Sequence, residues 1–449
     1  MIWAELLHLT GNMWTDRTAD CYRTRLAKDS AFSPKLVFDR GTWNRAVSRM
    51  AEAGMNMVLI DVGDGVVYDS HPEIAIEGSW SKAELRAELA RLRKMGLEPI
   101  PKLNFSSRHD SWLKDYHRML STEEYYRVCA DLIAEVGEIF DRPRFIHLGM
   151  DEEGPSNDEA FVAVRQGALW EHDLHFLLDC ARKNGMRPWI WWYGAHVEDE
   201  DAFFRRLPKD VIVSSAYYYP GGVTDENERM KAMRRLAELG LDIIPCGSNW
   251  ACDENMRETV AWSAASLPQE RVPGFLMASW MVTLPRYRHQ ILRSVDAMES
   301  AREMYEARDA EERPCVALWF VKDGQKSVDR TNYPEDRLIL WPDDQLVLDF
   351  GIARAGHPVL ELRSSWQNVP ATVTVRGANR LDGKRAVPEG EAVTYVVEEG
   401  DHRFVSEKAL PAARYLVITT DKKVFITGTA TATGSRFRRG EGKGDKDHE

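Results

Sequence analysis

Up to Arg302, the chain alternates between short runs that are mostly apolar and longer stretches in which apolar residues recur every three or four positions. The short runs have the length of strands, and the longer stretches have the period of a helix with one apolar face. The short runs are Ile2–Thr10, Met55–Val62, Leu97–Asn104, Arg144–Met150, Met186–Tyr193, Val211–Tyr219, Leu241–Ser248 and Gly274–Trp280. Apolar strands alternating with amphipathic helices predict an α/β fold with a parallel sheet. Eight such units favour a closed (β/α)8 TIM barrel over residues 1–310.

An open, doubly wound sheet is the alternative fold. Sheets of that kind often bind nucleotides through a GxGxxG or GxxxxGK[ST] turn after the first strand. Neither pattern follows the first apolar run of this sequence. Their absence favours the closed barrel.

Glycine and serine mark the helix boundaries in this region. Glycine suits the position after a helix because the left-handed conformation there is costly for a residue with a Cβ atom. Four amphipathic stretches end at such a glycine, followed by an apolar residue and a strand-like run: Gly54, Gly96, Gly185 and Gly240. Ser81 with Glu84 and Ser121 with Glu124 have the spacing of a capping box, which predicts that a helix begins at each serine.

After about Pro314 the pattern changes to short runs of alternating apolar and polar residues, separated by Gly, Pro, Asn and Asp. These runs are DRLILW, QLVLDF, PVLELRS, ATVTVRG, AVTYVVEE, RYLVITT and KKVFITG. A period of two predicts strands with one buried face, so we expect residues 311–433 to form a β-sandwich accessory domain. Residues 434–449 are rich in Gly and charge, which predicts a disordered tail.

Composition limits the classes of partner. Acidic residues outnumber basic ones by 71 to 59 and no long Lys/Arg cluster occurs, so we expect no nucleic-acid partner. The apolar runs fall well short of the ~20 residues that cross a bilayer, so we expect no membrane span. Six cysteines without CxxC spacing indicate neither a zinc site nor a disulfide framework. We expect no metal and no cofactor, and the oligomeric state stays open.

The first residues, Met1–Thr10, lack the basic start, long apolar stretch and cleavage site of a secretory signal. An exported chain whose signal had been removed would begin in the same way. The sequence therefore predicts either a cytoplasmic protein or a processed exported one.

The strongest candidate for chemistry follows the fourth apolar run, where Asp151, Glu152 and Glu153 precede a Gly-Pro turn. Active sites of TIM barrels lie at the carboxyl ends of the strands. Crowded acids repel one another, so at least one pKa should rise, which suits a general acid. The alternative is that these acids only begin a helix, where they favour the positive end of its dipole, although Gly154-Pro155 makes that start awkward.

Aromatic and polar residues follow the other apolar runs. Aromatic rings offer flat platforms for the C–H faces of a sugar, and polar groups can bind its hydroxyls, so we expect a carbohydrate substrate. For each aromatic residue the alternative is that it only packs the barrel. The candidate substrate-binding residues are Asn12, Trp14, Asp61, Asn104, His109, Trp192, Tyr218, Asn249, Trp250 and Trp280. His147, four residues before Asp151, is expected to support the site from inside the barrel.

The segment His147-Leu-Gly149-Met150-Asp151-Glu152 resembles the His-x-Gly-Gly-Asp-Glu motif of the family 20 glycoside hydrolases, the β-N-acetylhexosaminidases. Pro101-Lys102-Leu-Asn104-Phe-Ser-Ser-Arg-His109 is similar to a diverged form of that family's third-strand motif. The resemblance implies a substrate-assisted retaining mechanism, in which Glu152 is the general acid/base and Asp151 orients the 2-acetamido group of the substrate.

The sequence departs from that family at several sugar-binding positions. Met150 replaces a glycine and Lys102 replaces a glutamate, while Trp280-Met-Val282 and Trp250-Ala-Cys252 lack the expected acids. The exact sugar therefore does not carry over. Two alternatives stay open: a conventional glycosidase with Glu152 or Glu153 as acid and Asp61 or Asp64 as nucleophile, and a carbohydrate-binding barrel without catalysis.

Overall fold

A computed structural model describes residues 1–23, 28–153, 164–194, 197, 199–219, 221–306, 316–321, 324–327, 338–356, 358–364, 368–382, 385–406 and 408–431. The chain separates into two compact units, Met1–Ser300 and Ala301–Glu449. The predicted boundary between residues 310 and 311 and the predicted tail 434–449 lie outside the described residues.

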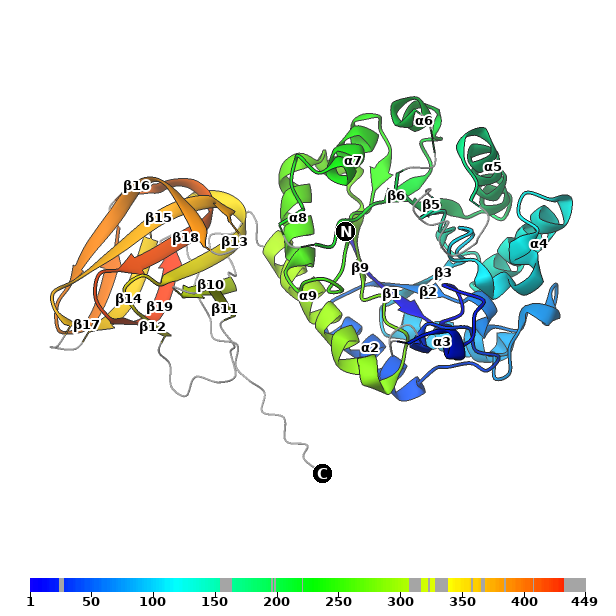
Figure 1. Ribbon diagram of the computed structural model, residues 1–449, viewed down its shortest axis with the longest axis horizontal. Coiled ribbons are helices and arrows are strands. Elements are labelled where there is room, and N and C mark those ends of the chain that lie inside the picture. Colours follow the sequence, from blue (N-terminus) through cyan, green and yellow to red (C-terminus); the bar gives the residue numbers. More distant parts are fainter. Residues whose placement is uncertain are drawn as a thin grey trace. The chain divides into compact units, whose positions relative to one another are not determined.

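The first unit is a closed ring of parallel strands (Figure 1). Strand β1 pairs with both β2 and β9, and the seventh barrel strand is split at Ile244-Pro245 into β7, which pairs with β6, and β8, which pairs with β9. The strands are β1 (Ile2–His8), β2 (Met57–Asp61), β3 (Glu98–Lys102), β4 (Phe145–His147), β5 (Arg187–Trp191), β6 (Ile212–Ser214), β7 (Asp242–Ile243), β8 (Cys246–Gly247) and β9 (Gly274–Ala278). All eight predicted runs form the ring, and the predicted TIM barrel is confirmed.

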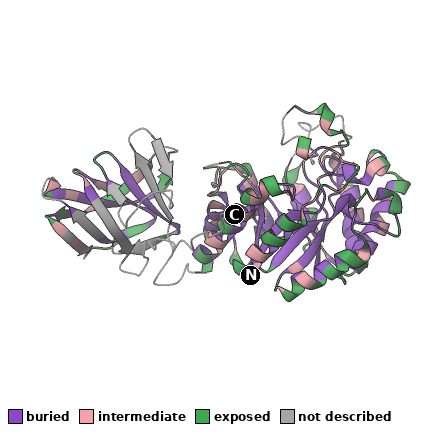
Figure 2. Cartoon of the chain, turned by 90° about the horizontal axis from the view of Figure 1, so that it is seen from below, coloured by how far each residue is buried: buried purple, intermediate pink, exposed green. Residues whose placement is uncertain are grey.

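Helices follow the strands and surround the ring (Figure 1). In Figure 2 the strands are buried, while the helices carry exposed residues on their outer sides. The α-helices are α2 (Arg40–Glu52), α3 (Lys82–Lys94), α4 (Glu123–Ile139), α5 (Gly167–Lys183), α6 (Glu200–Arg206), α7 (Glu228–Glu238), α8 (Asn255–Ser266) and α9 (Arg288–Glu306). Short 3-10 helices are η1 (Ala19–Cys21), η2 (Gly63–Gly65), η3 (Pro72–Ile74), η4 (Ser111–Arg118), η6 (Gln269–Arg271) and η7 (Pro285–Tyr287).

The predicted helix boundaries are largely confirmed. The four glycines after helices all have a positive φ, from 72° at Gly54 to 88° at Gly240. Ser81 and Glu84 form the predicted capping box of α3. The predicted box at Ser121 is wrong, because α4 begins one residue later and Thr122 caps it by accepting from the Tyr125 backbone N–H. The Ser121 hydroxyl donates to Asp173 Oδ2 instead, at 2.6 Å.

Alternation along the strands fills the barrel with two kinds of layer. The lower positions are apolar and include Leu6, Leu59, Ile100 and Phe145. Two residues further along each strand, the same inward face carries polar residues on four neighbouring strands. These are His8, Asp61, Lys102 and His147, which are partners in the strand register and are all buried. A polar layer therefore closes the carboxyl end of the barrel interior.

The second unit is a β-sandwich, as predicted. Its sheets, in spatial order, are β11 (Gly324–Ser327), β10 (Val316–Val321), β13 (Gln345–Gly356), β18 (Leu410–Thr420), β15 (Ala371–Leu381) and β16 (Ala386–Val397), and β12 (Leu338–Leu340), β19 (Val424–Thr431), β14 (Pro358–Ser364) and β17 (Gly400–Val405). Neighbouring strands are antiparallel. Both sheets contribute to one apolar core, which includes Leu348, Val373 and Ile418 from the first and Leu340, Leu360 and Val424 from the second.

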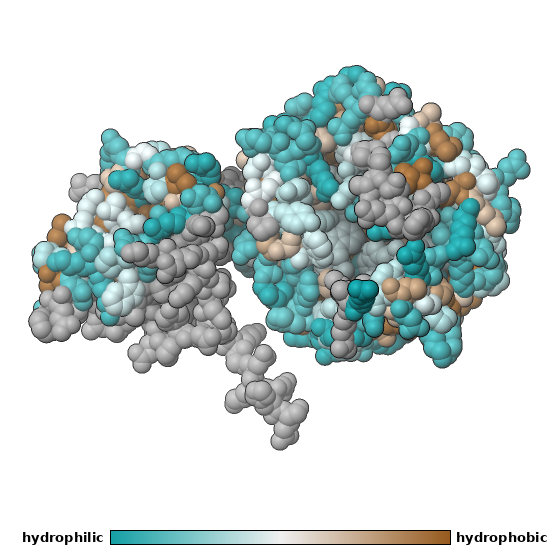
Figure 3. All heavy atoms as spheres, in the orientation of Figure 1, coloured by the Kyte–Doolittle hydropathy of each residue, from teal (hydrophilic) through white to brown (hydrophobic). Residues whose placement is uncertain are grey.

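The described surface seen in Figure 3 is mostly hydrophilic, with scattered apolar patches. Among the described residues, no helix combines the length and the apolar character needed to cross a membrane. Within the same residues, no group of three or more His, Cys, Asp or Glu side chains is arranged to hold a metal ion.

Candidate active site

A cavity of about 490 Å³ lies at the carboxyl ends of the barrel strands. Its lining comes from residues that follow β1, β3, β4, β5, β6, β8 and β9, so nearly the whole ring contributes. Of the residues singled out in the sequence, those that line it are Asp151, Glu152, Trp14, His109, Trp192, Tyr218, Trp250 and Trp280. The strand-end rule, by which candidates were chosen at the carboxyl ends of the strands, therefore selected mostly residues that lie together.

Left-handed backbone follows β4 and directs the two acids. The φ angles are 74° at Gly149, 69° at Met150 and 54° at Glu152. In a regular strand, consecutive side chains point to opposite faces. Here Asp151 and Glu152 both reach His109, because the chain turns between them. Asp151–Glu153 are not helical, so they do not begin a helix.

Gly149 is required by space as well as by its φ angle. A Cβ atom at this position would lie 1.8 Å from Asn104 Oδ1. Asn104 itself does not line the cavity, but its Nδ2 donates to Asp151 Oδ1 at 3.2 Å. The missing side chain at 149 therefore gives Asn104 the room to hold Asp151.

His109 joins the two carboxylates. Its Nδ1 lies 3.3 Å from Asp151 Oδ1, and its Nε2 lies 3.4 Å from Glu152 Oε2. Burial alone would lower the pKa of His109, but Asp151 and then Glu152 outweigh it and raise that pKa to about 9. At neutral pH the imidazole is therefore charged, and both of its ring nitrogens donate.

Asp151 is buried yet ionised at neutral pH. Burial would raise its pKa, but His109, Lys102 and Asn104 together hold the pKa of Asp151 below its usual range. The crowding of acids in the sequence led us to expect a raised pKa for at least one of the three acids, and the pKa of Asp151 is lowered instead. The three consecutive acids in the sequence gave no sign of His109 and Lys102, the cations that lie near Asp151 in the fold.

Glu153 has a different environment from its two neighbours. It is fully buried, and its carboxylate accepts from Arg165 Nε at 3.0 Å and from the Ser107 backbone N–H at 2.8 Å. Arg165 also pairs with Asp173, at 3.1 Å. Glu153 does not line the cavity. Its role is to tie the chain after β4 to the barrel, and it is not available as a general acid.

Three further predicted residues do not line the cavity and instead contact other parts of the fold. Asn12 Nδ2 donates to Ser33 O at 2.8 Å and to Asp64 Oδ2 at 2.7 Å. Asn249 Nδ2 donates to Gln290 O at 2.8 Å. Asp61 lies inside the barrel and pairs with Lys102.

Asp64, the other acid after β2, is also buried and accepts from Thr10 and Asn12. Burial outweighs these hydrogen bonds and raises its pKa to about 6. Neither Asp61 nor Asp64 belongs to the cavity lining, so neither faces the space between Asp151, Glu152 and the aromatic walls.

His147 lies inside the barrel, as expected. Its Nδ1 accepts from the Gly149 backbone N–H at 3.1 Å, and its ring packs 4.7 Å from Trp191. Burial keeps its pKa well below the usual range, so the ring is neutral. It supports the turn after β4 from below.

The aromatic rings that line the cavity differ in how much of their surface packs against the rest of the fold. Trp192 stacks on Phe203 with ring centroids 5.1 Å apart, and its Nε1 donates to Glu200 at 2.9 Å. Trp250 is 47% exposed and stands edge-on to Tyr219 at 5.8 Å. Trp192 therefore has one face committed to the fold, whereas Trp250 presents open ring surface at the cavity.

Sequence reasoning missed several lining residues, among them Trp191, Arg108 and Arg229. Trp191 could have been found from strand parity, since it follows the buried Trp189 by two positions. Its Nε1 and that of Trp280 are buried without a hydrogen-bond partner among the described residues. Arg229 lies on α7, away from any strand end, so the strand-end rule could not select it.

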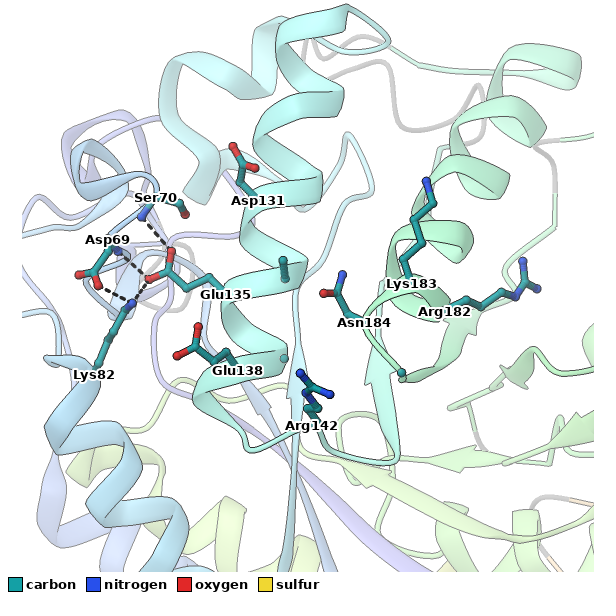
Figure 4. A pocket seen from close by; sticks show the side chains of 13 residues that line it. Asp69, Ser70, Lys82, Asp131, Glu135, Glu138, Arg142, Arg182, Lys183 and Asn184 are labelled. Atoms are coloured by element: carbon teal, nitrogen blue, oxygen red, sulfur yellow. Dashed lines mark hydrogen bonds and ion pairs between the residues drawn. The ribbon is translucent and has the colours of Figure 1, made fainter.

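A second cavity, of about 810 Å³, shares no residue with the first. Its charged residues come mainly from α3, α4 and α5 (Figure 4). Lys82 lies between Asp69 and Glu135, at 2.6 and 2.5 Å, and Glu135 also accepts from the Ser70 backbone N–H. These groups satisfy one another, which is typical of a structural ion-pair network.

No protein-family model matches the sequence, and no curated protein matches it. Solved structures match with low identity. The family 20 exo-β-N-acetylglucosaminidase of Vibrio harveyi, in complex with N-acetylglucosamine, is 16% identical with a TM-score of 0.45, over 67% of this chain and 54% of that one. The family 20 β-N-acetylhexosaminidase of Streptomyces coelicolor A3(2) is 15% identical with a TM-score of 0.44, over 65% of this chain and 63% of that one.

A structure of the pneumococcal virulence factor StrH, from a study of N-glycan recognition and hydrolysis, is 14% identical with a TM-score of 0.48. That match covers 68% of this chain and 85% of the other. This chain thus spans 54% and 63% of the lengths of the Vibrio and Streptomyces enzymes. At these values the comparisons assign no activity to this chain.

Proposed function

We propose that this protein is a glycoside hydrolase that cleaves β-linked 2-acetamido sugars by a substrate-assisted, retaining mechanism. The observation that carries the proposal is the contact of one charged histidine, His109, with both Asp151 and Glu152 in an aromatic-walled cavity. A cavity of about 490 Å³ lies within the usual size range of small-molecule sites.

Glu152 is the proposed general acid. Its side chain is 30% exposed, which gives it access to the cavity. In its protonated form it donates its proton to the glycosidic oxygen as the bond from that oxygen to the anomeric carbon breaks, and the charged His109 stabilises the carboxylate that remains. After the leaving group departs, the anomeric carbon is bonded to the acetamido oxygen of the substrate. The Glu152 carboxylate takes a proton from the water that attacks this carbon, the bond to the acetamido oxygen breaks, and both the acid and the acetamido group are restored.

Asp151 is the proposed orienting residue. It is ionised and held by His109 and Asn104, so it can accept a hydrogen bond from the acetamido N–H. The acetamido carbonyl oxygen then attacks the anomeric carbon, and the Asp151 carboxylate offsets the positive charge that develops on the acetamido group.

The proposal favours this mechanism over a conventional pair of carboxylates. A conventional retaining pair lies about 5 Å apart on opposite sides of the glycosidic bond. Among the described residues that line the cavity, Asp151 and Glu152 are the only carboxylates, and both lie on the same side, against His109. An internal nucleophile from the substrate needs no carboxylate on the opposite side.

Chromogenic substrates test the proposal. We expect turnover of a β-N-acetylglucosaminide or β-N-acetylgalactosaminide, and much slower turnover of the matching β-glucoside or β-galactoside. Glu152→Gln should lower kcat by about 10²- to 10⁴-fold, while Glu226→Gln, an exposed acid outside the cavity, should leave it unchanged.

The outcomes separate the alternatives. Full activity of Glu152→Gln would contradict the assignment of the acid. Equal turnover of glycosides without an acetamido group, with no inhibition by a thiazoline analogue of the substrate-assisted intermediate, would favour a conventional mechanism. Sugar binding that survives Asp151→Asn with Glu152→Gln, without turnover of any glycoside, would favour a non-catalytic carbohydrate-binding barrel.

A further inference from the structure

Charge in the cavity is unevenly distributed. The charged side chains among its described lining are Arg108, His109, Asp151, Glu152 and Arg229. His109 is shared by the two carboxylates, which leaves the two arginines. In the described part of the chain, no carboxylate oxygen lies within 4.0 Å of either guanidinium. The described lining of the cavity is therefore net positive in a chain whose net charge is -12.

Arg229 is held in a fixed orientation by uncharged partners. Its Nη1 donates to the Ala216 carbonyl oxygen at 2.9 Å, and its Cζ lies 3.8 Å from the centroid of the Tyr193 ring. These contacts position the guanidinium without neutralising it. A guanidinium has five N–H donors, so most of them stay available to a ligand in the cavity. Such a preorganised donor favours an anion.

Arg108 is placed by the turn that also positions His109. The His109 backbone N–H donates to Ser106 O at 2.8 Å, and the Arg108 backbone N–H donates to Ser106 Oγ at 3.3 Å. Arg108 follows β3, and Arg229 follows β6 on α7. Because β4 and β5 lie between β3 and β6 in the ring, the two arginines flank the acid pair and the aromatic wall.

We propose that the saccharide bound in this cavity carries an anionic substituent, either a sulfate ester or a carboxylate, which Arg229 binds and which the positive charge of Arg108 also attracts. This inference rests on the proposed function, which identifies the ligand as a saccharide, and adds the chemical class of that saccharide. Guanidinium groups bind carboxylate and sulfate oxygens through paired, charge-assisted hydrogen bonds. Among the described residues, a neutral sugar would leave two half-buried positive charges without a counterion.

Direct binding measurements on the full chain test this inference without relying on turnover. The probes are N-acetylglucosamine, its 6-sulfate and 3-sulfate, and glucose against glucuronic acid, titrated by the fluorescence of the cavity tryptophans or by calorimetry. We expect at least one charged sugar to bind about tenfold tighter than its neutral counterpart. The sulfate and carboxylate arms tell the two substituents apart.

Arginine variants then test whether Arg229 and Arg108 cause the preference for charged sugars. Arg229→Gln should reduce the ratio of charged to neutral affinity about fivefold or more, and Arg108→Gln should reduce it further. Lys231→Gln removes an exposed charge from the same helix and should leave the ratio unchanged. The preference should also shrink in high salt, because screening weakens the interaction.

Equal affinity for charged and neutral sugars, or no binding of any charged sugar, would overturn the inference. A preference that persists in the Arg108→Gln, Arg229→Gln double variant would overturn it as well. Hydrolysis of neutral acetamido glycosides without any anion preference would remove only this inference. Selective binding of charged sugars without hydrolysis of any glycoside would instead remove only the proposed function.

Discussion

Strands β2 and β4 both lead to carboxylates that meet a cation, but the two regions are built differently. Asp61 on β2 pairs with Lys102 on β3, and both side chains are fully buried in the polar layer inside the barrel. Asp151 and Glu152 after β4 share His109 at the cavity, and the Glu152 side chain is 30% exposed. The first pair is closed to any ligand, whereas the second group is open to one.

The comparison shows that the end of a strand alone does not make a functional acid. A buried carboxylate with its own cation has its charge matched and its oxygens enclosed, so it contributes to the barrel and does not meet substrate. Glu153 with Arg165 belongs to this closed kind, although it directly follows Glu152. Asp151 and Glu152 differ because they line the cavity and share a single histidine between two carboxylates.

Breaking the closed pair should have the largest effect on stability. Lys102→Met leaves Asp61 buried without its main counterion, so we expect a loss of about 3 to 5 kcal/mol in the free energy of unfolding. Combining it with Asp61→Leu should recover much of that loss, because the unpaired charge is then gone. Denaturant unfolding monitored by circular dichroism measures both. If Lys102→Met alone left stability unchanged, the pair would not be the closed structural element described above.

Substitutions of Glu153 and Glu152 should have different effects on stability. Glu153→Gln weakens the contacts to Arg165, which keeps Asp173 as a partner, so we expect a loss of about 1.5 to 3 kcal/mol. Glu152→Gln is the matched control, and its unfolding midpoint should stay near that of the wild type while its activity falls. Equal destabilisation by the two variants would contradict the division into a closed and an open acid.

The pH dependence of stability tests the contribution of His109 itself. The pKa of His109 is about 9 in the folded protein and ordinarily near 6.5, so its raised value stabilises the fold fully below pH 6.5. That contribution is lost as the pH rises from 6.5 through about 9. Thermal unfolding across this window should show a declining midpoint, and the decline should weaken in His109→Gln. A decline that is identical in both proteins would remove His109 as its source.

The barrel could be predicted from the sequence because its signals are local. Glycines after helices and apolar runs of strand length mark each unit, and all eight runs form strands. Asp151 and Glu152 could be located for the same reason. The strand-end rule also chose Asn12, Asp61 and Asn249, whose polar groups contact residues far away in the sequence. Those contacts have no local signal.

Two features of the site could not be predicted from any pattern in the sequence. Met150 and Glu152 adopt left-handed backbone although neither is glycine, so nothing in their identity predicted the turn that directs both acids to His109. Arg229 reaches the cavity from a helix and is placed by the Ala216 carbonyl oxygen and the Tyr193 ring. Tertiary packing, which the sequence does not display, decides both.

The close approach at Gly149 limits which substitutions this chain can accept. Any side chain there would displace Asn104, and through it the carboxylate of Asp151, even if the barrel still folded. The next position carries a methionine in the same left-handed region, and its side chain is fully buried. Engineering of new specificities in this scaffold should therefore leave position 149 untouched and vary the rim.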